Sequence, residues 1–358
     1  MKHFFSLILL SLIVSLATIS VAYSQILPER ERATLRDEIL KDRFDNLLPQ
    51  LMDDTGIDMW LVIAREYNED PVMRTMLPAT WLNARRRTIL VFYRNKEQNT
   101  LERLAVARYD VGANITSSWD KEKQPNQWKR LVEIIKERPV EKIGINISKH
   151  FGIADGLVKT DYQELMEALP SDLEEKIVSA EKLAIAWIET RTEKEMLLYN
   201  QLVDITSAII DQAFSAAVIT PGKTTTDDIV WWMRQKVTSL GLETWFHPTI
   251  DVQRNNEALQ SHIYSFSKGE KQKTVLPGDL LHCDFGITYI SLNTDCQRHA
   301  YVLRNGETQV PEFLASAFAK GNQVQDIFTG NFKTGSTGNQ ILAKSLKQAR
   351  DKGLRPSI

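Results

Sequence analysis

The sequence predicts two domains, an α/β domain followed by a domain in which helices come before strands. The length of 358 residues fits about two domains at roughly 150 residues each. Strand and helix signals alternate between residues 58 and 169, which is typical of an α/β fold. Helical patterns then dominate residues 192–241, and strand patterns follow from Trp245.

The composition is that of a globular protein and excludes several other classes. Hydrophobic residues make up 43% of the chain and charged residues 25%, which excludes intrinsic disorder and fibrous classes. The net charge is −2, so there is no basic excess for binding nucleic acid by charge, and we expect no nucleic-acid partner. The 2 cysteines exclude a disulfide scaffold and a cysteine-rich zinc or iron–sulfur module.

Residues 1–24 have the pattern of a signal peptide. A short polar start is followed by an almost wholly apolar stretch, residues 4–22. Ala22-Tyr23-Ser24 has small residues at the two positions that a signal peptidase reads, so Gln25 would begin the mature chain. We therefore expect a secreted or periplasmic protein with no membrane contact after cleavage. The alternative is an uncleaved membrane anchor, because the apolar stretch is just long enough to span a bilayer.

The first predicted domain covers residues 25–176. Charged residues with helical spacing predict a helix over residues 30–55. Short apolar runs and amphipathic segments predict the alternating elements: strands at 58–63, 88–93 and 142–146, and helices at 128–135 and 162–169. The charged stretch 171–176 is the expected boundary region.

The second predicted domain, residues 177–358, opens with two helices. Thr192-Glu193-Lys194-Glu195 is a capping-box pattern, in which the Thr hydroxyl and the Glu carboxylate each bind an unpaired backbone N–H. Thr225-Thr226-Asp227-Asp228 caps the second helix, and Gly241 ends it. Apolar residues at helical spacing define the inward face of the first helix: Leu198, Leu202, Ile205, Ile209 and Ala213.

Two aspartates in neighbouring strand patterns indicate a cation site. Asp284 lies in the strand pattern 280–286, and Asp295 lies in a second one, 293–298. Their separation of 11 residues (295 − 284) suits adjacent antiparallel strands. Two neighbouring carboxylates repel each other unless a cation or a proton lies between them. Carboxylate oxygens suit Mg, Mn or Ca and also accept Zn or Co. The alternative is one Asp at a turn and the other paired with Arg298.

These strands resemble the metal-binding hairpin of a known superfamily. The matching segments are Gly278-Asp279-Leu280-Leu281-His282-Cys283-Asp284-Phe285-Gly286 and Thr294-Asp295-Cys296-Gln297-Arg298. They are similar to the creatinase/methionine aminopeptidase/aminopeptidase P superfamily of M24-type metallopeptidases. Residues 188–195 resemble the entry into the first helix of its catalytic domain. Residues 30–175 resemble the creatinase-type domain that precedes it in the aminopeptidase P branch.

The resemblance implies both a fold and a chemistry. Residues 177–358 would form the first part of an α+β "pita-bread" catalytic domain that binds two divalent metal ions (Mn, Co or Zn). Asp284 would bind one ion, Asp295 would bridge both, and His262 would contact the peptide substrate or the transition state. A histidine on a surface loop is the alternative for His262. The implied activity is removal of an N-terminal residue, often one before proline, by metal-activated water. A homodimer is compatible with the resemblance.

The chain departs from this family in its metal ligands. The family site uses two Asp, then a His and two Glu from the later half of the domain. No histidine follows His299, and the only glutamates after Asp295, Glu307 and Glu312, are too close to the hairpin. We therefore expect a C-terminally truncated sequence that is inactive as it stands. Two other classes stay open, a non-catalytic pita-bread binding protein and a metal-free creatinase-like amidinohydrolase. The aspartate pair counts against the second.

The hairpin also predicts that two cysteines are neighbours. If Asp284 and Asp295 are directly opposite, the numbers of opposite residues sum to 579, so Cys283 and Cys296 are opposite on the other face. We expect these cysteines to be adjacent, either as a disulfide or as two small core thiols.

Two segments match the glycosylation pattern, Asn114-Ile115-Thr116 and Asn146-Ile147-Ser148. The second lies in or beside a predicted strand. We predict that both are unmodified, which an intact-mass measurement of the secreted protein tests.

Overall fold

The computed structural model describes residues 26–254 and 273–356. The predicted signal peptide and His262 lie outside these residues. The chain divides into two compact units, which are described separately below. Unit 1 comprises residues 1–209, 236–246 and 286–296, and unit 2 comprises residues 210–235, 247–285 and 297–358. The domain boundaries inferred from the sequence remain predictions.

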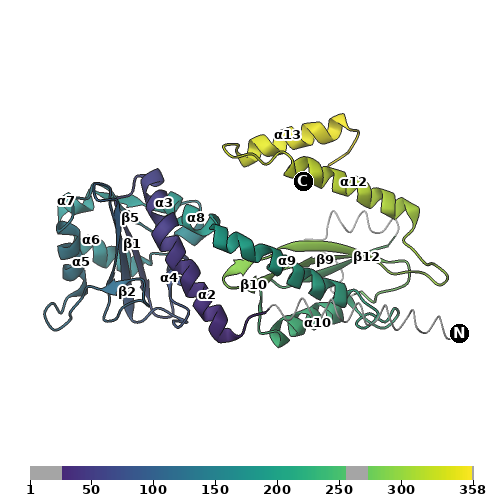
Figure 1. Cartoon of the computed structure of the whole chain (residues 1–358), viewed down its shortest axis with the longest axis horizontal. Helices are drawn as coiled ribbons and strands as arrows, with labels where there is room; N and C mark the ends of the chain where they lie inside the picture. Colours follow the sequence, from purple (N-terminus) through teal and green to yellow (C-terminus); the bar gives the residue numbers. More distant parts are fainter. Residues whose placement is uncertain (1–25, 255–272, 357–358) are drawn as a thin grey trace. The chain divides into compact units, whose positions relative to one another are not determined.

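A six-stranded sheet forms the centre of the predicted α/β domain (Figure 1). Its strand order is β4-β3-β2-β1-β5-β6. β1 pairs antiparallel with β2 and parallel with β5, and β3 pairs parallel with β4. The strands are β1 (Met59–Arg65), β2 (Arg87–Asn95), β3 (Thr100–Val106), β4 (Thr116–Ser117), β5 (Ile143–Ile145) and β6 (Ile177–Ser179).

Helices cover both faces of this sheet because its central strands are apolar on both sides. Alternate residues of β1 face opposite ways, so Trp60 and Val62 join one core cluster while Met59 and Leu61 join the other. The first cluster is covered by α2 (Glu29–Asp42), the π-helical segment η1 (Arg43–Leu47), α3 (Leu48–Thr55), α4 (Pro71–Met76), η2 (Gly152–Ala154) and α8 (Glu181–Glu189). The second is covered by α5 (Gln127–Lys136), α6 (Lys159–Ala168) and α7 (Ser171–Glu174).

A buried polar chain crosses the first core cluster. The Trp60 indole N–H donates to Asn146 Oδ1 (2.8 Å), and Asn146 Nδ2 donates to Asp70 Oδ2 (2.9 Å). Asp70 also caps α4 by accepting from the N–H of Val72, and burial raises the pKa of this carboxyl. Asn146 is only 1% exposed. Its buried, hydrogen-bonded amide nitrogen supports the prediction that this glycosylation motif is not modified.

Both helices predicted for the second half are present, as α9 (Glu193–Ala213) and α10 (Thr226–Ser239). The capping box of α9 forms as expected, because the Thr192 N–H donates to Glu195 Oε2 (2.7 Å) and the Glu195 N–H donates to the Thr192 hydroxyl (3.4 Å). Along α9, Leu198 is half-buried. The other residues of the predicted inward face are fully buried: Leu202, Ile205, Ile209 and Ala213.

Two short sheets and a helical hairpin complete the described residues. In unit 1 the strands β7 (Glu243–Thr244), β10 (Ile287–Tyr289) and β11 (Leu292–Asn293) form a sheet in the order β11-β10-β7. In unit 2 the strands β8 (Thr249–Gln253), β9 (Leu280–Phe285) and β12 (Cys296–Tyr301) form a sheet in the order β12-β9-β8. The chain then forms α12 (Glu312–Thr329) and α13 (Gly338–Asp351). Within the described residues, no helix combines the length and the hydropathy needed to cross a membrane.

A strained two-residue turn joins β10 to β11. Ile290 and Ser291 have φ angles of 53° and 63°, between the paired residues Tyr289 and Leu292. Hairpin turns with positive φ at both central positions match the twist of the strands and favour Asn-Gly. A β-branched residue in this region of φ is a conformational outlier. The turn therefore has the right geometry for the hairpin but unfavourable residues.

Replacing Ile290 by Asn and Ser291 by Gly should stabilise the protein. We expect the free energy of unfolding to rise by about 1 kcal/mol, since the left-handed conformation costs L-residues roughly 1–2 kcal/mol and Gly almost nothing. Urea denaturation measures the change. Ile290→Val, which keeps the β-branched side chain, is the control and should change the stability little. A double variant less stable than the parent would contradict the strain at this turn.

Candidate metal centre

Asp284 lies on the polar face of the sheet in unit 2. It is in β9, which pairs with β8 so that Thr249 is opposite Asp284 and Asp251 is opposite His282. Burial alternates along β9, with His282 and Asp284 half-buried and Cys283 fully buried on the opposite face. The alternating pattern of the strand thus brings a carboxylate and an imidazole to one side of the sheet.

Residues of β12 meet this face. Gln297 Nε2 donates a hydrogen bond to Asp284 Oδ1 (3.0 Å). The rings of His282 and His299 lie 4.9 Å apart between centroids, and His282 Nδ1 is 3.9 Å from a carboxylate oxygen of Asp251. Burial, together with the nearby His282, lowers the pKa of His299. The face therefore combines carboxylates with an amide and two imidazoles.

The register of the hairpin differs from the predicted one by two residues. In unit 2 the contacting pairs Asp284–Gln297 and His282–His299 have residue numbers that sum to 581, not 579. In unit 1 the pairing of β10 with β11 also sums to 581. The two-residue turn fixes the register of β10 and β11, because turn geometry determines which residues of a hairpin are opposite. These contacts differ from the register considered in the sequence analysis, in which Asp295 is directly opposite Asp284, because Gln297 contacts Asp284.

Asp295 lies in unit 1, between β11 and β12, and is exposed. The strand predicted over residues 293–298 is interrupted at Thr294 and Asp295. The buried Thr294 hydroxyl accepts from the N–H of Ile287 (3.1 Å) and shares a hydrogen bond with the Thr206 hydroxyl on α9 (2.8 Å). This side chain anchors the backbone immediately before Asp295.

Asp279 anchors the start of β9 through an ion pair that the sequence pattern did not indicate. Its carboxylate is 2% exposed and accepts from Arg254 Nε (2.6 Å) and Nη2 (2.8 Å) and from the N–H of Leu276 (2.7 Å). A turn precedes the strand, and Gly278 in it has φ +94°. A side chain at that position would be strained, which explains the Gly-Asp sequence.

The two cysteines differ in burial. Cys283 is buried and Cys296 is half-buried. The expected adjacency of the two cysteines, as a disulfide or as two small core thiols, remains a prediction.

The described residues do not fit a complete two-metal centre. Of the three site residues expected from the sequence, His262 lies outside the described residues. Within residues 26–254 and 273–356, no group of three or more His, Cys, Asp or Glu is arranged to hold a metal ion. Catalytic metal sites usually use three or more protein ligands. The two aspartates are therefore candidate metal ligands and do not by themselves form a complete metal site.

Residues 198–357 match the model of metallopeptidase family M24, and this part of the chain belongs to that family. Enzymes of the family depend on two metal ions. The family resemblance found in the sequence is thereby confirmed. No curated protein matches the chain at a significant level.

Solved structures of peptidases share the fold of this chain. The X-Pro aminopeptidase from Thermotoga maritima is 15% identical, with a TM-score of 0.58 over 85% of this chain and 78% of that chain. Aminopeptidase P from E. coli is 10% identical, with a TM-score of 0.59 over 88% and 75%. The prolidase from Pyrococcus horikoshii is 14% identical, with a TM-score of 0.51 over 86% and 77%. The pita-bread fold predicted for the second half is confirmed.

Proposed function

We propose that the chain is part of an aminopeptidase P-like metalloaminopeptidase, a hydrolase that removes the N-terminal residue of a peptide, in particular a residue before proline. The observation that carries the proposal is the half-buried Asp284 on the polar face of β9, within the region that matches family M24. The fold shared with an X-Pro aminopeptidase and with aminopeptidase P supports the choice of branch. The signal-peptide pattern of residues 1–24 supports export as part of the same proposal.

In this proposal Asp284 and Asp295 bind divalent cations such as Mn, Co or Zn. When bound, such ions lower the pKa of a water molecule and polarise the scissile carbonyl. The contribution of Asp284 is an anionic oxygen ligand held in place by the Gln297 amide. The remaining His and Glu ligands of the family would come from residues outside those that the structure describes.

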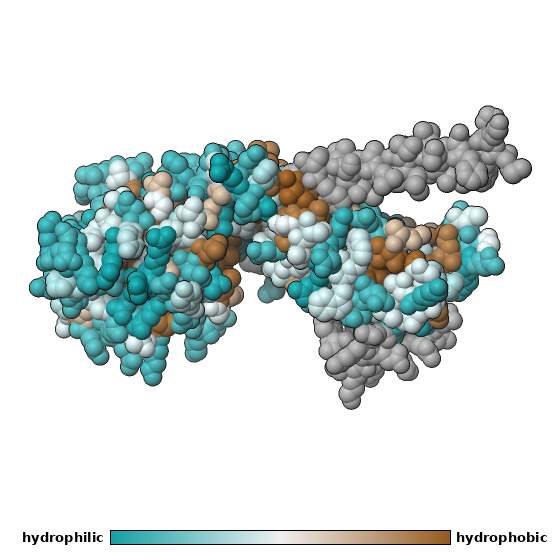
Figure 2. Space-filling model, turned by 90° about the horizontal axis from the view of Figure 1, so that it is seen from below, coloured by the Kyte–Doolittle hydropathy of each residue, from teal (hydrophilic) through white to brown (hydrophobic). Residues whose placement is uncertain are grey.

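Helix α12 supports the idea that further residues complete the catalytic domain. Ile327 is the only buried residue of this helix. Phe313 and Phe318 on the same helix are 71% and 57% exposed. Exposed aromatic residues along one helix are typical of a surface that another segment covers. The surface of the α/β domain that Figure 2 shows is, by contrast, mostly hydrophilic.

A manganese titration of residues 25–358 tests the ligand role of Asp284. We expect weak binding, with a dissociation constant on the order of 10⁻³ M, because few charged ligands give weak sites. Electron paramagnetic resonance of free Mn²⁺ measures it. Asp284→Asn should abolish this weak Mn²⁺ binding.

Asp326→Asn is the matched control, since it removes the same charge from an exposed position on α12. It should leave Mn²⁺ binding unchanged. Equal Mn²⁺ binding by Asp284→Asn and the parent chain would contradict the ligand role. That result would favour the second candidate, a non-catalytic binding protein. The observation that supports this candidate is that the described residues contain no group of three possible metal ligands.

A further inference from the structure

A cavity of about 370 Å³ lies at one edge of the six-stranded sheet, in unit 1. It forms where β2 begins and where the parallel strands β3 and β4 end. Its lining includes four arginines: Arg85, Arg86, Arg87 and Arg108. The carboxyl ends of parallel strands are a common position for ligand sites in α/β domains.

The positive charge of this cavity is largely uncompensated. Arg87 is neutralised by ion pairs with Asp161 (3.1 Å) and Glu164 (2.6 Å). The other three arginine side chains have no ion pair with a carboxylate among residues 26–254 and 273–356, and no acidic residue lines the cavity. A concave site lined by charges of one sign concentrates ions of the opposite sign. The cavity therefore attracts an anion.

Aromatic rings form the other walls of the cavity. The guanidinium of Arg85 lies over the Trp81 ring, 4.5 Å from its centroid, and 5.7 Å from the centroid of the Tyr109 ring. Trp119 completes the aromatic lining. Stacking of a guanidinium on aromatic rings restricts its orientation. The site therefore offers both oriented donors and apolar surface.

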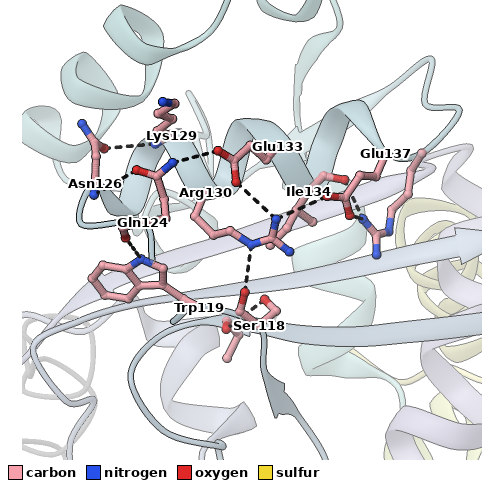
Figure 3. A network of polar contacts seen from close by, with 11 residues as sticks. Ser118, Trp119, Gln124, Asn126, Lys129, Arg130, Glu133, Ile134 and Glu137 are labelled. Carbon is pink, nitrogen blue, oxygen red and sulfur yellow. Dashed lines mark hydrogen bonds and ion pairs between the residues drawn. The ribbon is translucent and has the colours of Figure 1, made fainter. Parts of the chain in front are cut away.

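The wall that contains Trp119 is held in place by a hydrogen-bond network (Figure 3). The Trp119 indole N–H donates to the Gln124 carbonyl (2.6 Å), and the Gln124 side chain donates to Glu133 on α5 (2.8 Å). Arg130 Nε, also on α5, donates to the Ser118 carbonyl (2.9 Å). A wall that is ordered before binding reduces the entropy lost when a ligand binds.

We propose that this cavity binds a small organic anion in which a phosphate or carboxylate group is attached to a planar ring. The planar fork of arginine matches both of these anionic groups. The volume lies in the range of about 300–1,000 Å³ that is usual for small-molecule sites. The aromatic walls suit the ring. This site is independent of the proposed peptidase activity, because all of its residues belong to the α/β domain.

Calorimetric titration of residues 25–358 with phenyl phosphate and with benzene-1,3-dicarboxylate tests the proposal. We expect saturable binding of at least one of these two anions. The anion that binds more tightly shows whether the cavity prefers a phosphate or a carboxylate group. Inorganic phosphate should bind at least about tenfold more weakly than phenyl phosphate, because it lacks the ring. Binding should weaken as salt concentration rises.

Arg86→Gln and Arg108→Gln should each weaken binding about tenfold, since each removes a charge-assisted donor. Both side chains are exposed, so these variants should fold normally. Arg30→Gln is the matched control, because Arg30 is exposed and lies outside the cavity. The proposal is overturned if neither ring-bearing anion binds, if inorganic phosphate binds as tightly as phenyl phosphate, or if Arg30→Gln weakens binding as much as the cavity variants.

Discussion

Replacing Glu195 by Gln should lower the free energy of unfolding by about 3–5 kcal/mol, because it leaves the buried charge of Arg43 without its partner. The two side chains are 9% and 7% exposed, and Arg43 Nη1 lies 2.7 Å from Glu195 Oε2 and 3.0 Å from Oε1. Arg43 also donates to the backbone carbonyls of Trp187 and Thr190 and stacks over the Trp187 ring, 4.4 Å from its centroid.

The choice of Gln separates the ion pair from the helix cap. Glu195 also completes the capping box of α9 by accepting from the N–H of Thr192. Gln can fill that place in a capping box as well, so the loss of stability measures the ion pair. Urea denaturation followed by circular dichroism gives the free energy. Glu193→Gln, an exposed residue in the same helical turn, is the control and should change the stability by less than about 0.5 kcal/mol.

A double variant, Arg43→Met with Glu195→Leu, provides a second test of this prediction. An apolar pair of similar volume can replace a buried ion pair at little cost, whereas removing one partner is expensive. The double variant should therefore be more stable than Glu195→Gln. If Glu195→Gln unfolds at the same urea concentration as the parent chain, the buried pair is not a main contributor to stability.

Local patterns in the sequence predicted the elements that depend on neighbouring residues. The capping box at Thr192 and Glu195 and the buried face of α9 could be read because the interacting residues lie three or four positions apart. The strands β1 and β2 were evident from their apolar runs, which are buried on both faces of the sheet. Arg43 and Glu195 could not be paired in this way, because they lie 152 positions apart.

The register of the hairpin shows the limit of pattern reading at the candidate site. Both aspartates were found from their strand patterns and from the family resemblance, but the turn between β10 and β11 was not. Ile290 and Ser291 adopt a conformation that normally signals Asn-Gly, so no residue pattern marked the turn. The contact of Gln297 with Asp284 and the ring contact of His282 with His299 were not foreseen.

The largest functional effect that we expect concerns peptidase activity. Residues 25–358 should show no chelator-sensitive hydrolysis of a short Xaa-Pro peptide. The physical reason is the number of ligands. Two carboxylates repel each other and need further neutral and anionic ligands to hold two cations, and the described residues contain no group of three candidate ligands. The outer surface of α12 is also exposed, which favours aggregation over a stable catalytic domain.

The measurement is release of the N-terminal residue with Mn²⁺, Co²⁺ or Zn²⁺ added, each with and without a chelator. We expect rates equal to the uncatalysed background in every case. A polypeptide that also contains the His and two Glu of the family site should hydrolyse the peptide. In that polypeptide Asp295→Ala should abolish turnover, whereas His262→Ala should reduce turnover and leave metal bound. Strong chelator-sensitive hydrolysis by residues 25–358 would show that the ligand set is different from the one proposed, and full activity of the extended Asp295→Ala variant would exclude the bridging role of Asp295.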